Sequence, residues 1–418
     1  MKNYNVLIDG YNLRLKKGSG IKYYTLSLIK AIQNDVDVAL LFDYEILNDT
    51  ISSIEFCDAH LKGILNSNNK KALIKDILKL IFKKNYYKFN LQDKKTFFNE
   101  DSYILNKKIL NINNIFNIAE IASRYNYYFE LDNIKNIDIF HSTYMLNFGI
   151  KGAKRITTIH DIIPLKLPHT TLDDKKLFYN KIKKAIEVSD KIITISEHSK
   201  KDILEMFDID ESKIVNCYQA YTINKDEISS SNLNLKNRFD LENKEYFLFV
   251  GNIEPKKNVG RLIEAYLDLD IDKKLVIVGK KAWLWEELLR GAQKFINEGR
   301  IVLLDYVSRR ELISLYKNAY FFVFPSLYEG FGLPPLEAMA CECPVITSHS
   351  SSLPEVCGNG AIYCNPYDVN SIKDALNEAL NISDKRREEL INIGKSRVEF
   401  FNLEDYKKRI LNVYESVL

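Results

Sequence analysis

The sequence predicts an α/β protein with two Rossmann-like domains that face each other across a cleft. Short apolar runs alternate with longer segments of helical periodicity, which is the pattern of parallel sheets with crossover helices. The alternation occurs twice, on either side of a polar stretch at 223–243 that is rich in Ser, Asn and Lys and that we interpret as the interdomain linker. The length of 418 residues also favours two domains over one.

In the first half, the apolar runs that predict strands are bounded by polar or glycine-containing turns. The helices between them show apolar residues at helical spacing. The expected strands are 6–9, 36–42, 137–141, 155–160, 191–196 and 214–217, and the clearest helices are 171–188 and 197–206.

The second half repeats the pattern with more strongly apolar strands, as expected for a parallel sheet covered on both faces. The carboxyl ends of these strands should face the cleft, where ligands bind in open α/β sheets. The expected strands are 246–250, 274–278, 301–304, 320–324, 344–347 and 361–364, and the expected helices are 259–266, 283–297, 308–317 and 369–380.

Composition excludes several classes of protein. No apolar run is long enough to cross a bilayer, and residues 1–9 do not form a signal peptide, so we expect a cytoplasmic protein. Six scattered cysteines without a Cys-x-x-Cys pair indicate buried thiols in a reducing compartment and no zinc site. A net charge of +3 gives no reason to expect nucleic acid as a partner.

The segment 62–108 carries twelve lysines and four acids, interleaved with aromatic residues. Apolar residues recur at helical spacing between Leu73 and Phe82. A basic amphipathic helix of this kind can lie on an anionic membrane surface. The alternative is a helix that faces the core and exposes its lysines to solvent.

The richest stretch in chemistry is 329–337, which places Glu329 and Glu337 eight positions apart around a glycine loop. It follows a predicted strand and leads into a predicted helix at 336–341, with prolines at the first turn, where proline costs least. The free backbone N–H groups of a helix start should point out of this turn toward a ligand. Gly330 and Gly332 allow the backbone to approach a ligand. Carboxylates accept hydrogen bonds from sugar hydroxyls, although a Glu in a first turn is favourable without any ligand. The stretch therefore predicts a site for a molecule that is both phosphate and sugar.

Five elements of the chain, in order, resemble the motifs of glycosyltransferase family 4, a group of retaining enzymes with the GT-B fold and mannosyltransferase-like members. Segment 329–337 is similar to the family's Glu-x7-Glu motif. The others are the His-Asp-x-x-Pro element at 159–164, the Ser-x-x-Ser element within 194–199, the Gly-x-x-Glu-Pro-x-Lys-Asn element within 249–258, and Ser-Ser-Leu-Pro-Glu-Val at 351–356 followed by Gly358.

The resemblance implies a domain organisation. Residues 1–225 would form the acceptor-binding domain and residues 240–400 the nucleotide-sugar-binding domain. The last segment, 403–418, has apolar residues at helical spacing and would form a helix that crosses back onto the N-terminal domain.

It also implies the roles of catalytic residues. Lys257 would bind the donor diphosphate, Glu329 would face the donor sugar, and His160 would lie beside the reacting centre. Glu337 would bind the ribose hydroxyls. On the residues alone, a lone His at a strand end such as His160 or His141 is more often structural.

The remaining expected substrate-binding residues lie around these. Backbone N–H groups near Gly332 and Leu333 would meet the distal phosphate, and Lys256 would share the work of Lys257. Ser196 and Ser199 either touch the acceptor or only cap a helix. Asn252 stands where some relatives carry an arginine, so one expected cation is missing. Glu342 stands where a glycine is usual, which suggests that the turn after the helix at 336–341 differs from the family's. The other expected contacts are Gly18, Gly20, Asp161, Gly251, Gly330 and Phe331.

The function implied is transfer of a hexose from a nucleotide-sugar donor to a saccharide or lipid-linked acceptor in surface polysaccharide or O-antigen synthesis. The Ser-Ser-Leu-Pro-Glu-Val element favours GDP-mannose as donor. No cofactor and no metal are expected, because pairs such as Asp208/Asp210 and Asp268/Asp270 are explained as surface acids. The alternatives are a GT-B sugar-nucleotide epimerase or hydrolase, and a GT-B subunit without activity that binds a partner.

Overall fold

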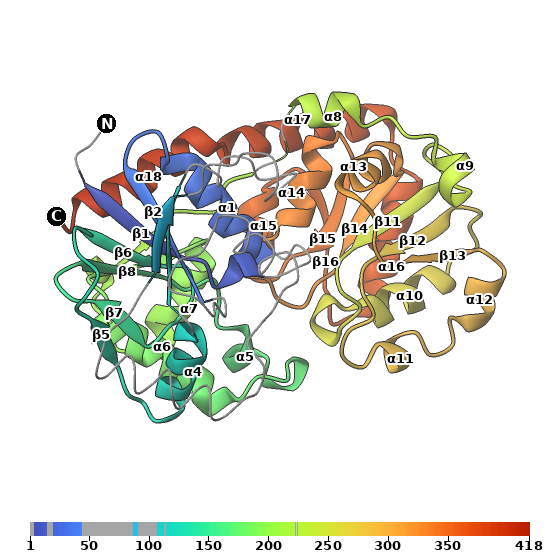
Figure 1. Cartoon of the computed structure of the whole chain (residues 1–418). Helices are drawn as coiled ribbons and strands as arrows, with labels where there is room; N and C mark the ends of the chain where they lie inside the picture. Colours follow the sequence, from blue (N-terminus) through green and yellow to red (C-terminus); the bar gives the residue numbers. More distant parts are fainter. Residues whose placement is uncertain are drawn as a thin grey trace.

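The structure is a computed structural model that describes residues 4–14, 20–43, 87–90, 107–112, 114–221, 223 and 225–418. Two sheets of mainly parallel strands, one from each half of the chain, lie side by side with helices around them (Figure 1). The basic segment 62–108 lies almost entirely outside the described residues, and so does the proposed membrane contact. Among the described helices, none is both long and apolar enough to span a membrane.

The N-terminal sheet has eight strands in the order β10-β9-β8-β6-β1-β2-β4-β3, all parallel except the edge strand β3. All six expected strands are present, with ends shifted by one or two residues. Four short strands were not expected: β3, β4, β5 and β7, of which β5 and β7 pair with each other. The bounds are β1 Asn5–Asp9, β2 Asp37–Phe42, β3 Tyr87–Asn90, β4 Lys108–Asn111, β5 Phe129–Leu131, β6 Ile139–Ser142, β7 Phe148–Ile150, β8 Lys154–Thr158, β9 Lys191–Thr194 and β10 Ile214–Asn216.

Helix starts in this half follow the capping residues. Asp174 accepts a hydrogen bond from the Leu177 amide, so α6 begins at Lys175 and not at 171. Ser196 caps α7 in the same way, and α7 has the expected bounds. The helices are α1 Gly20–Ile32, α4 Ile115–Arg124, α5 Ile163–Lys166, α6 Lys175–Val188 and α7 Glu197–Met206, with 3-10 turns η1 Asn12–Arg14, η3 Pro168–Thr170 and η4 Glu211–Lys213.

The C-terminal sheet has six parallel strands in the order β13-β12-β11-β14-β15-β16. Four of the six have the expected bounds, and the other two are shifted by one residue. Most of their side chains are buried, because helices cover both faces of the sheet, and the edge strand β13 is the least buried. The bounds are β11 Tyr246–Val250, β12 Lys274–Val278, β13 Ile301–Leu304, β14 Phe321–Phe324, β15 Val345–Ser348 and β16 Ala361–Cys364.

The helix expected at 283–297 is wrong as a single element. It is two short helices separated around Gly291, whose φ of 84° is left-handed. The other expected helices are present, and α14 starts at Leu333 with both prolines in its first turn. The helices are η5 Pro255–Lys257, α10 Val259–Leu267, α11 Trp285–Leu288, α12 Gln293–Asn297, α13 Arg309–Asn318, α14 Leu333–Ala340, α15 Leu353–Cys357, α16 Val369–Leu380, α17 Asp384–Phe400 and α18 Leu403–Glu415.

The polar stretch at 223–243, which we interpreted as the interdomain linker, contains two short helices. It forms α8 Lys225–Ser230 and α9 Leu235–Phe239, and it packs on α13. Arg309 of α13 pairs with both carboxylate oxygens of Glu227, and Leu235 and Leu241 are buried. The polar composition of this stretch did not predict these helices. Short helices that pack on α13 need only a few buried apolar residues, such as Leu235 and Leu241.

The last helix crosses back onto the N-terminal half, as the resemblance implied. α18 lies against α1 and the start of the chain (Figure 1). Tyr406 and Tyr414 are fully buried there, and the Tyr414 hydroxyl lies 2.7 Å from Nδ1 of His141. Burial of two tyrosine rings stabilises the contact by several kcal/mol, on the order of 2 kcal/mol for each ring.

The expectation about Glu342 was wrong. Its φ of 59° is the left-handed conformation that a glycine would take at the end of α14, so the turn itself is retained. The Cys343 amide donates to the Ala338 carbonyl across this turn. The side chain is exposed and pairs with Lys395 at 2.9 Å.

Candidate active site

A buried ion pair lies at the carboxyl edge of the C-terminal sheet. Nζ of Lys257, at the end of η5, lies 2.6 Å from Oε1 of Glu329, in the loop after β14. β11 and β14 are neighbours, so the segments that follow them meet at one edge. Only 15% of the Lys257 side chain and 12% of the Glu329 side chain are exposed. An ammonium group and a carboxylate with so little solvent around them are well placed to contact a charged, hydroxyl-rich ligand.

Lys256 adds a second cation at this edge. Burial works against its charge, but Glu254, Glu329 and Asp161 together raise the pKa of Lys256 above its ordinary value. Lys256 therefore stays protonated across the physiological range. Its Nζ lies 3.5 Å from Glu254.

The turn after β11 is confined by its neighbours. The Gly251 amide donates to the Val278 carbonyl, and a Cβ at Gly251 would lie 3.7 Å from the Lys257 side chain. A Cβ on Gly279, in the next turn, would collide with the Gly251 carbonyl oxygen. Sequence reasoning missed Gly279, although its place after a buried strand was a usable signal. Asn252 is exposed on this turn.

The first turn of α14 lies directly after the Glu329 loop. Gly332 precedes the helix with a φ of 114°, and Leu333 is its first residue. This left-handed backbone aims the helix start, and a Cβ at Gly332 would also lie 2.8 Å from Leu353. The ring of Phe331 packs edge-on against Phe401 at 5.2 Å, so it anchors the loop in the core rather than facing the ligand side.

Hydroxyl groups from the 350–352 turn hold the same loop. The Glu329 amide donates to Oγ of Ser351, and Oγ of Ser352 lies 2.6 Å from the Phe331 carbonyl oxygen and 2.9 Å from that of Glu329, so its single proton is shared between them. Ser351 and Ser352 are the first two residues of the Ser-Ser-Leu-Pro-Glu-Val element. Sequence reasoning connected this element with the choice of donor and not with support of the Glu329 loop.

Glu337 lies in α14 and accepts a hydrogen bond from the Tyr316 hydroxyl at 3.1 Å. Burial raises the pKa of Glu337 from 4.5 to about 7, although Arg309 and Tyr316 oppose this effect. The ionised form of Glu337 is therefore unfavourable in the folded protein. A carboxyl group kept in such a position indicates a functional role and not a stabilising one.

We expect Glu337→Gln to change the pH dependence of stability. The folded protein holds the Glu337 proton up to about pH 7, while the unfolded chain loses it near 4.5, so this group weakens the fold as pH rises between these values. Relative to wild type, the variant should gain on the order of 2–3 kcal/mol in unfolding free energy at pH 8 compared with pH 4. Urea unfolding at both pH values measures this.

The matched control is Glu342→Gln, which removes an exposed carboxylate just after the same helix. An equal gain in both variants would contradict the assignment to burial. Glu337→Gln should at the same time weaken binding of a nucleoside diphosphate, since the amide replaces one acceptor by a donor.

His160 follows β8 in the N-terminal half and is almost completely buried. Its Nε2 lies 3.0 Å from the Thr143 carbonyl, and the ring of Tyr24 meets it edge-on at 4.8 Å. Burial lowers the pKa of His160 to about 4, so the ring is neutral at physiological pH. The carbonyl can only accept, so Nε2 carries the proton and Nδ1 keeps its lone pair.

Asp161 follows and is positioned by its own turn. Its Oδ1 accepts from the Ile163 amide at 3.0 Å. Burial raises the pKa of Asp161, and the nearby Lys256 opposes this. Charges from both halves of the chain therefore act on one another here.

The two halves meet directly at this point. A Cβ on Gly330 would lie 2.9 Å from the His160 carbonyl oxygen and 3.0 Å from the Asp161 Cβ. Oγ of Ser196 donates to the Gly330 carbonyl at 2.7 Å, and Oγ of Ser199 lies 3.0 Å from the His160 carbonyl. Ser196 is fully buried in these bonds, so they bind the loop of Glu329 to the N-terminal half.

A second bridge involves the start of α7. Glu355, of α15, accepts hydrogen bonds from the amides of Glu197 at 2.7 Å and His198 at 3.1 Å. A carboxylate is favourable at a helix N-terminus. Sequence reasoning missed this contact, because it joins residues more than 150 positions apart.

Some predicted residues lie elsewhere or remain undescribed. Gly18 lies outside the described residues. Gly20 begins α1, is exposed, and accepts from the Gln219 side chain at 3.3 Å. His141 is structural, since Tyr414 and Thr158 engage both ring nitrogens and burial lowers its pKa to about 3. Among the described residues, no cluster of His, Cys, Asp or Glu could hold a metal ion.

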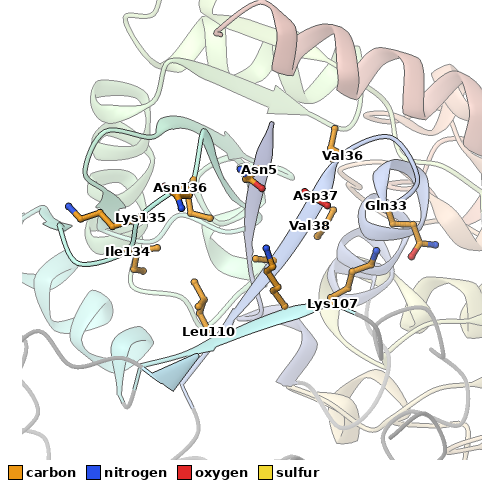
Figure 2. Close-up of a pocket in the computed structure, with 13 residues that line it drawn as sticks. Asn5, Gln33, Val36, Asp37, Val38, Lys107, Leu110, Ile134, Lys135 and Asn136 are labelled. Atoms are coloured by element: carbon orange, nitrogen blue, oxygen red, sulfur yellow. The ribbon is translucent and has the colours of Figure 1, made fainter. Parts of the chain in front are cut away.

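The hollow shown in Figure 2 is not part of this site. It measures about 390 Å³ and is lined by residues such as Asn5, Asp37 and Lys107. Asn5 and Asp37 are the first residues of β1 and β2, whereas Asp9 and His160 lie at or just after the carboxyl ends of strands. The hollow therefore opens at the opposite edge of the N-terminal sheet.

Comparison with known proteins identifies the family. Residues 232–397 match the model of "Glycosyl transferases group 1", a range that contains Lys257, Glu329 and Glu337 but not His160. The chain is also 32% identical to the O-antigen chain mannosyltransferase B of Escherichia coli over 272 residues. The aligned region covers 63% of this chain and 70% of the relative. The chain belongs to the glycosyl transferases group 1 family. It is therefore a glycosyltransferase, and the resemblance read from its motifs is confirmed.

Two further comparisons extend along the chain. The O-antigen chain mannosyltransferase RfbU of Salmonella typhimurium is 24% identical over 369 residues, covering 88% of this chain and 89% of the relative. The crystal structure of Anabaena Alr3699/HepE in complex with UDP-glucose superposes with a TM-score of 0.65 at 13% identity, covering 99% of each chain. This second likeness shows that the glycosyltransferase has the GT-B fold.

Proposed function

We propose that this glycosyltransferase transfers a hexose, most simply mannose from GDP-mannose, to a saccharide or lipid-linked saccharide acceptor in the synthesis of O-antigen or a related surface polysaccharide. The sequence relatives that support this donor sugar and this product are the O-antigen chain mannosyltransferases. The cytoplasmic face of the plasma membrane is the proposed place of reaction.

The observation that carries the proposal is the Lys257–Glu329 pair beside the N-terminus of α14. The departing diphosphate gains negative charge as the bond to the anomeric carbon breaks. An ammonium group and the backbone amides of Gly332 and Leu333 at the helix start can stabilise this charge without a metal, whereas Pro334 and Pro335 of the first turn carry no N–H. Arrival of the donor would draw Lys257 toward phosphate and free Glu329 to accept from the sugar hydroxyls.

We infer a retaining reaction on one face of the sugar. The anomeric carbon loses its bond to the phosphate oxygen and gains a bond to the acceptor oxygen on the same face. The acceptor proton passes to the departing phosphate oxygen, so no side chain has to act as the base. His160, neutral and held by Thr143, would contribute a hydrogen bond and not a charge.

Calorimetry with GDP-, UDP- and dTDP-sugars in EDTA tests the donor, and a transfer assay with the donor that binds tests the reaction. The proposal expects GDP-mannose to bind best and its product to keep the α configuration, which NMR coupling constants of the new glycoside report. Binding only with added manganese, or an inverted product, would overturn it.

A further inference from the structure

Thr143 lies between the end of β1 and His160, and it is held from two sides. Its carbonyl accepts from Nε2 of His160 at 3.0 Å. Its amide donates a short hydrogen bond to Oδ2 of Asp9, the last residue of β1. Nδ2 of Asn12 lies 3.1 Å from the Thr143 hydroxyl oxygen and 3.4 Å from its carbonyl oxygen.

Asp9 is built into this position. It is fully buried, and its other oxygen accepts from the Tyr11 amide at 3.1 Å. Burial raises the pKa of Asp9 to about 6, although the bonds from Thr143 and Tyr11 oppose this. It is therefore mostly a carboxylate at neutral pH and can accept from two amides at once. A buried carboxylate that only serves a turn is an expensive choice compared with a neutral cap.

We propose that Asp9 is a positioning residue for the transfer reaction: it fixes Thr143 so that the Thr143 carbonyl keeps the His160 ring in one orientation and in the Nε2–H tautomer. Nδ1 of His160 then keeps its lone pair for a hydroxyl of the bound sugars. No hydrogen bond to Nδ1 is found among the described residues. The inference rests on the proposed function only in giving His160 a part in transfer.

A second set of contacts involves Tyr24 and the His160 ring. The Tyr24 ring meets His160 edge-on, and the Tyr24 hydroxyl lies 2.8 Å from Oγ1 of Thr158. Thr158 in turn lies 2.8 Å from Nε2 of His141. A ring contact restrains the His160 ring without selecting a tautomer, so the tautomer depends on the bond to Thr143, and through it on Asp9.

The test is Asp9→Asn. The asparagine side chain keeps the shape of aspartate but has only one acceptor oxygen. The backbone N–H groups of Thr143 and Tyr11 each bond to a different oxygen of Asp9, so one of them loses its partner in the variant. Imidazole ¹⁵N NMR on protein labelled at its six histidines reports the tautomer, and His160→Gln assigns the signal. We expect wild type to show an unprotonated Nδ1, and the variant to show a mixture of tautomers. We expect kcat to fall about tenfold to a hundredfold with little change in the donor KM.

Asp138→Asn is the matched control, because Asp138 accepts from the Asn5 amide at 2.7 Å at the opposite end of β1. It should leave both the His160 signal and kcat unchanged. Asn12→Ala removes the other hydrogen-bonding contact to Thr143 and should also shift the tautomer. This variant keeps the proposal testable if Asp9→Asn fails to fold.

An unchanged ¹⁵N signal in both tether variants would overturn the positioning role whatever the donor is. A shifted signal with unchanged kcat would instead overturn the part assigned to His160 in the proposed reaction. Failure of GDP-mannose to react leaves the NMR result readable, so the two failures are distinguishable.

Discussion

Lys257→Ala should lower kcat for transfer by about 10²- to 10³-fold, the loss seen when one preorganised group that stabilises developing charge is removed. Lys257 is the cation nearest to Glu329, with 2.6 Å between the charged atoms, and it lies where the diphosphate would meet the N-terminus of α14. Binding of a nucleoside diphosphate should weaken as well, because the ammonium contacts the same group before and during the reaction. Steady-state kinetics and calorimetry measure the two effects.

Two controls separate this effect from a loss of stability. Lys273→Ala breaks a lysine–glutamate pair of similar length, 3.0 Å to Glu245, at the other edge of the same sheet, and it should retain activity. The double variant Lys257→Ala with Glu329→Gln removes the carboxylate that the single change leaves unpaired. Recovery of transfer in the double variant would show that Lys257 only neutralises Glu329 and does not stabilise the diphosphate.

Gly330→Ala should separate the two halves of the site. The new Cβ would lie 2.9 Å from the His160 carbonyl oxygen and 3.0 Å from the Asp161 Cβ, and backbone cannot yield as a flexible side chain does. Overpacking of this kind costs about 1–3 kcal/mol. Displacement of Glu329 from His160 by a fraction of an ångström to about 1 Å should lower kcat by up to about a hundredfold.

Thermal unfolding and kinetics measure these effects. Gly260→Ala is the control, because its Cβ would lie 3.4 Å from the nearest atom, within a helix that favours alanine. Full activity of Gly330→Ala would contradict the close contact between the halves in the reacting state.

The strands of the C-terminal half were predictable because a covered parallel strand is a continuous apolar run. Tyr246–Val250, Lys274–Val278, Ile301–Leu304 and Ala361–Cys364 needed no correction. The failures have physical causes. Gly291 divides a helix that periodicity alone would continue, and the short strand β4 follows a lysine-rich segment and contains only two consecutive apolar residues.

The site was predictable in its residue types but not in its connections. The motifs follow predicted parallel strands, so they predicted that Lys257, Glu329 and Glu337 would lie at one edge of a sheet. It could not indicate that Ser196 donates to the Gly330 carbonyl across 134 positions, since only tertiary packing creates that bond. For the same reason Asp9 looked like the end of a strand and not like a partner of Thr143.

The most direct test of the central claim is a crystal structure of the enzyme with the donor that binds best, grown in EDTA. We expect the diphosphate between Nζ of Lys257 and the amides of Gly332 and Leu333 at the start of α14, with Glu329 released toward the sugar and Glu337 on the ribose. A nucleotide bound elsewhere, or a diphosphate held by a metal ion in place of Lys257, would contradict this claim.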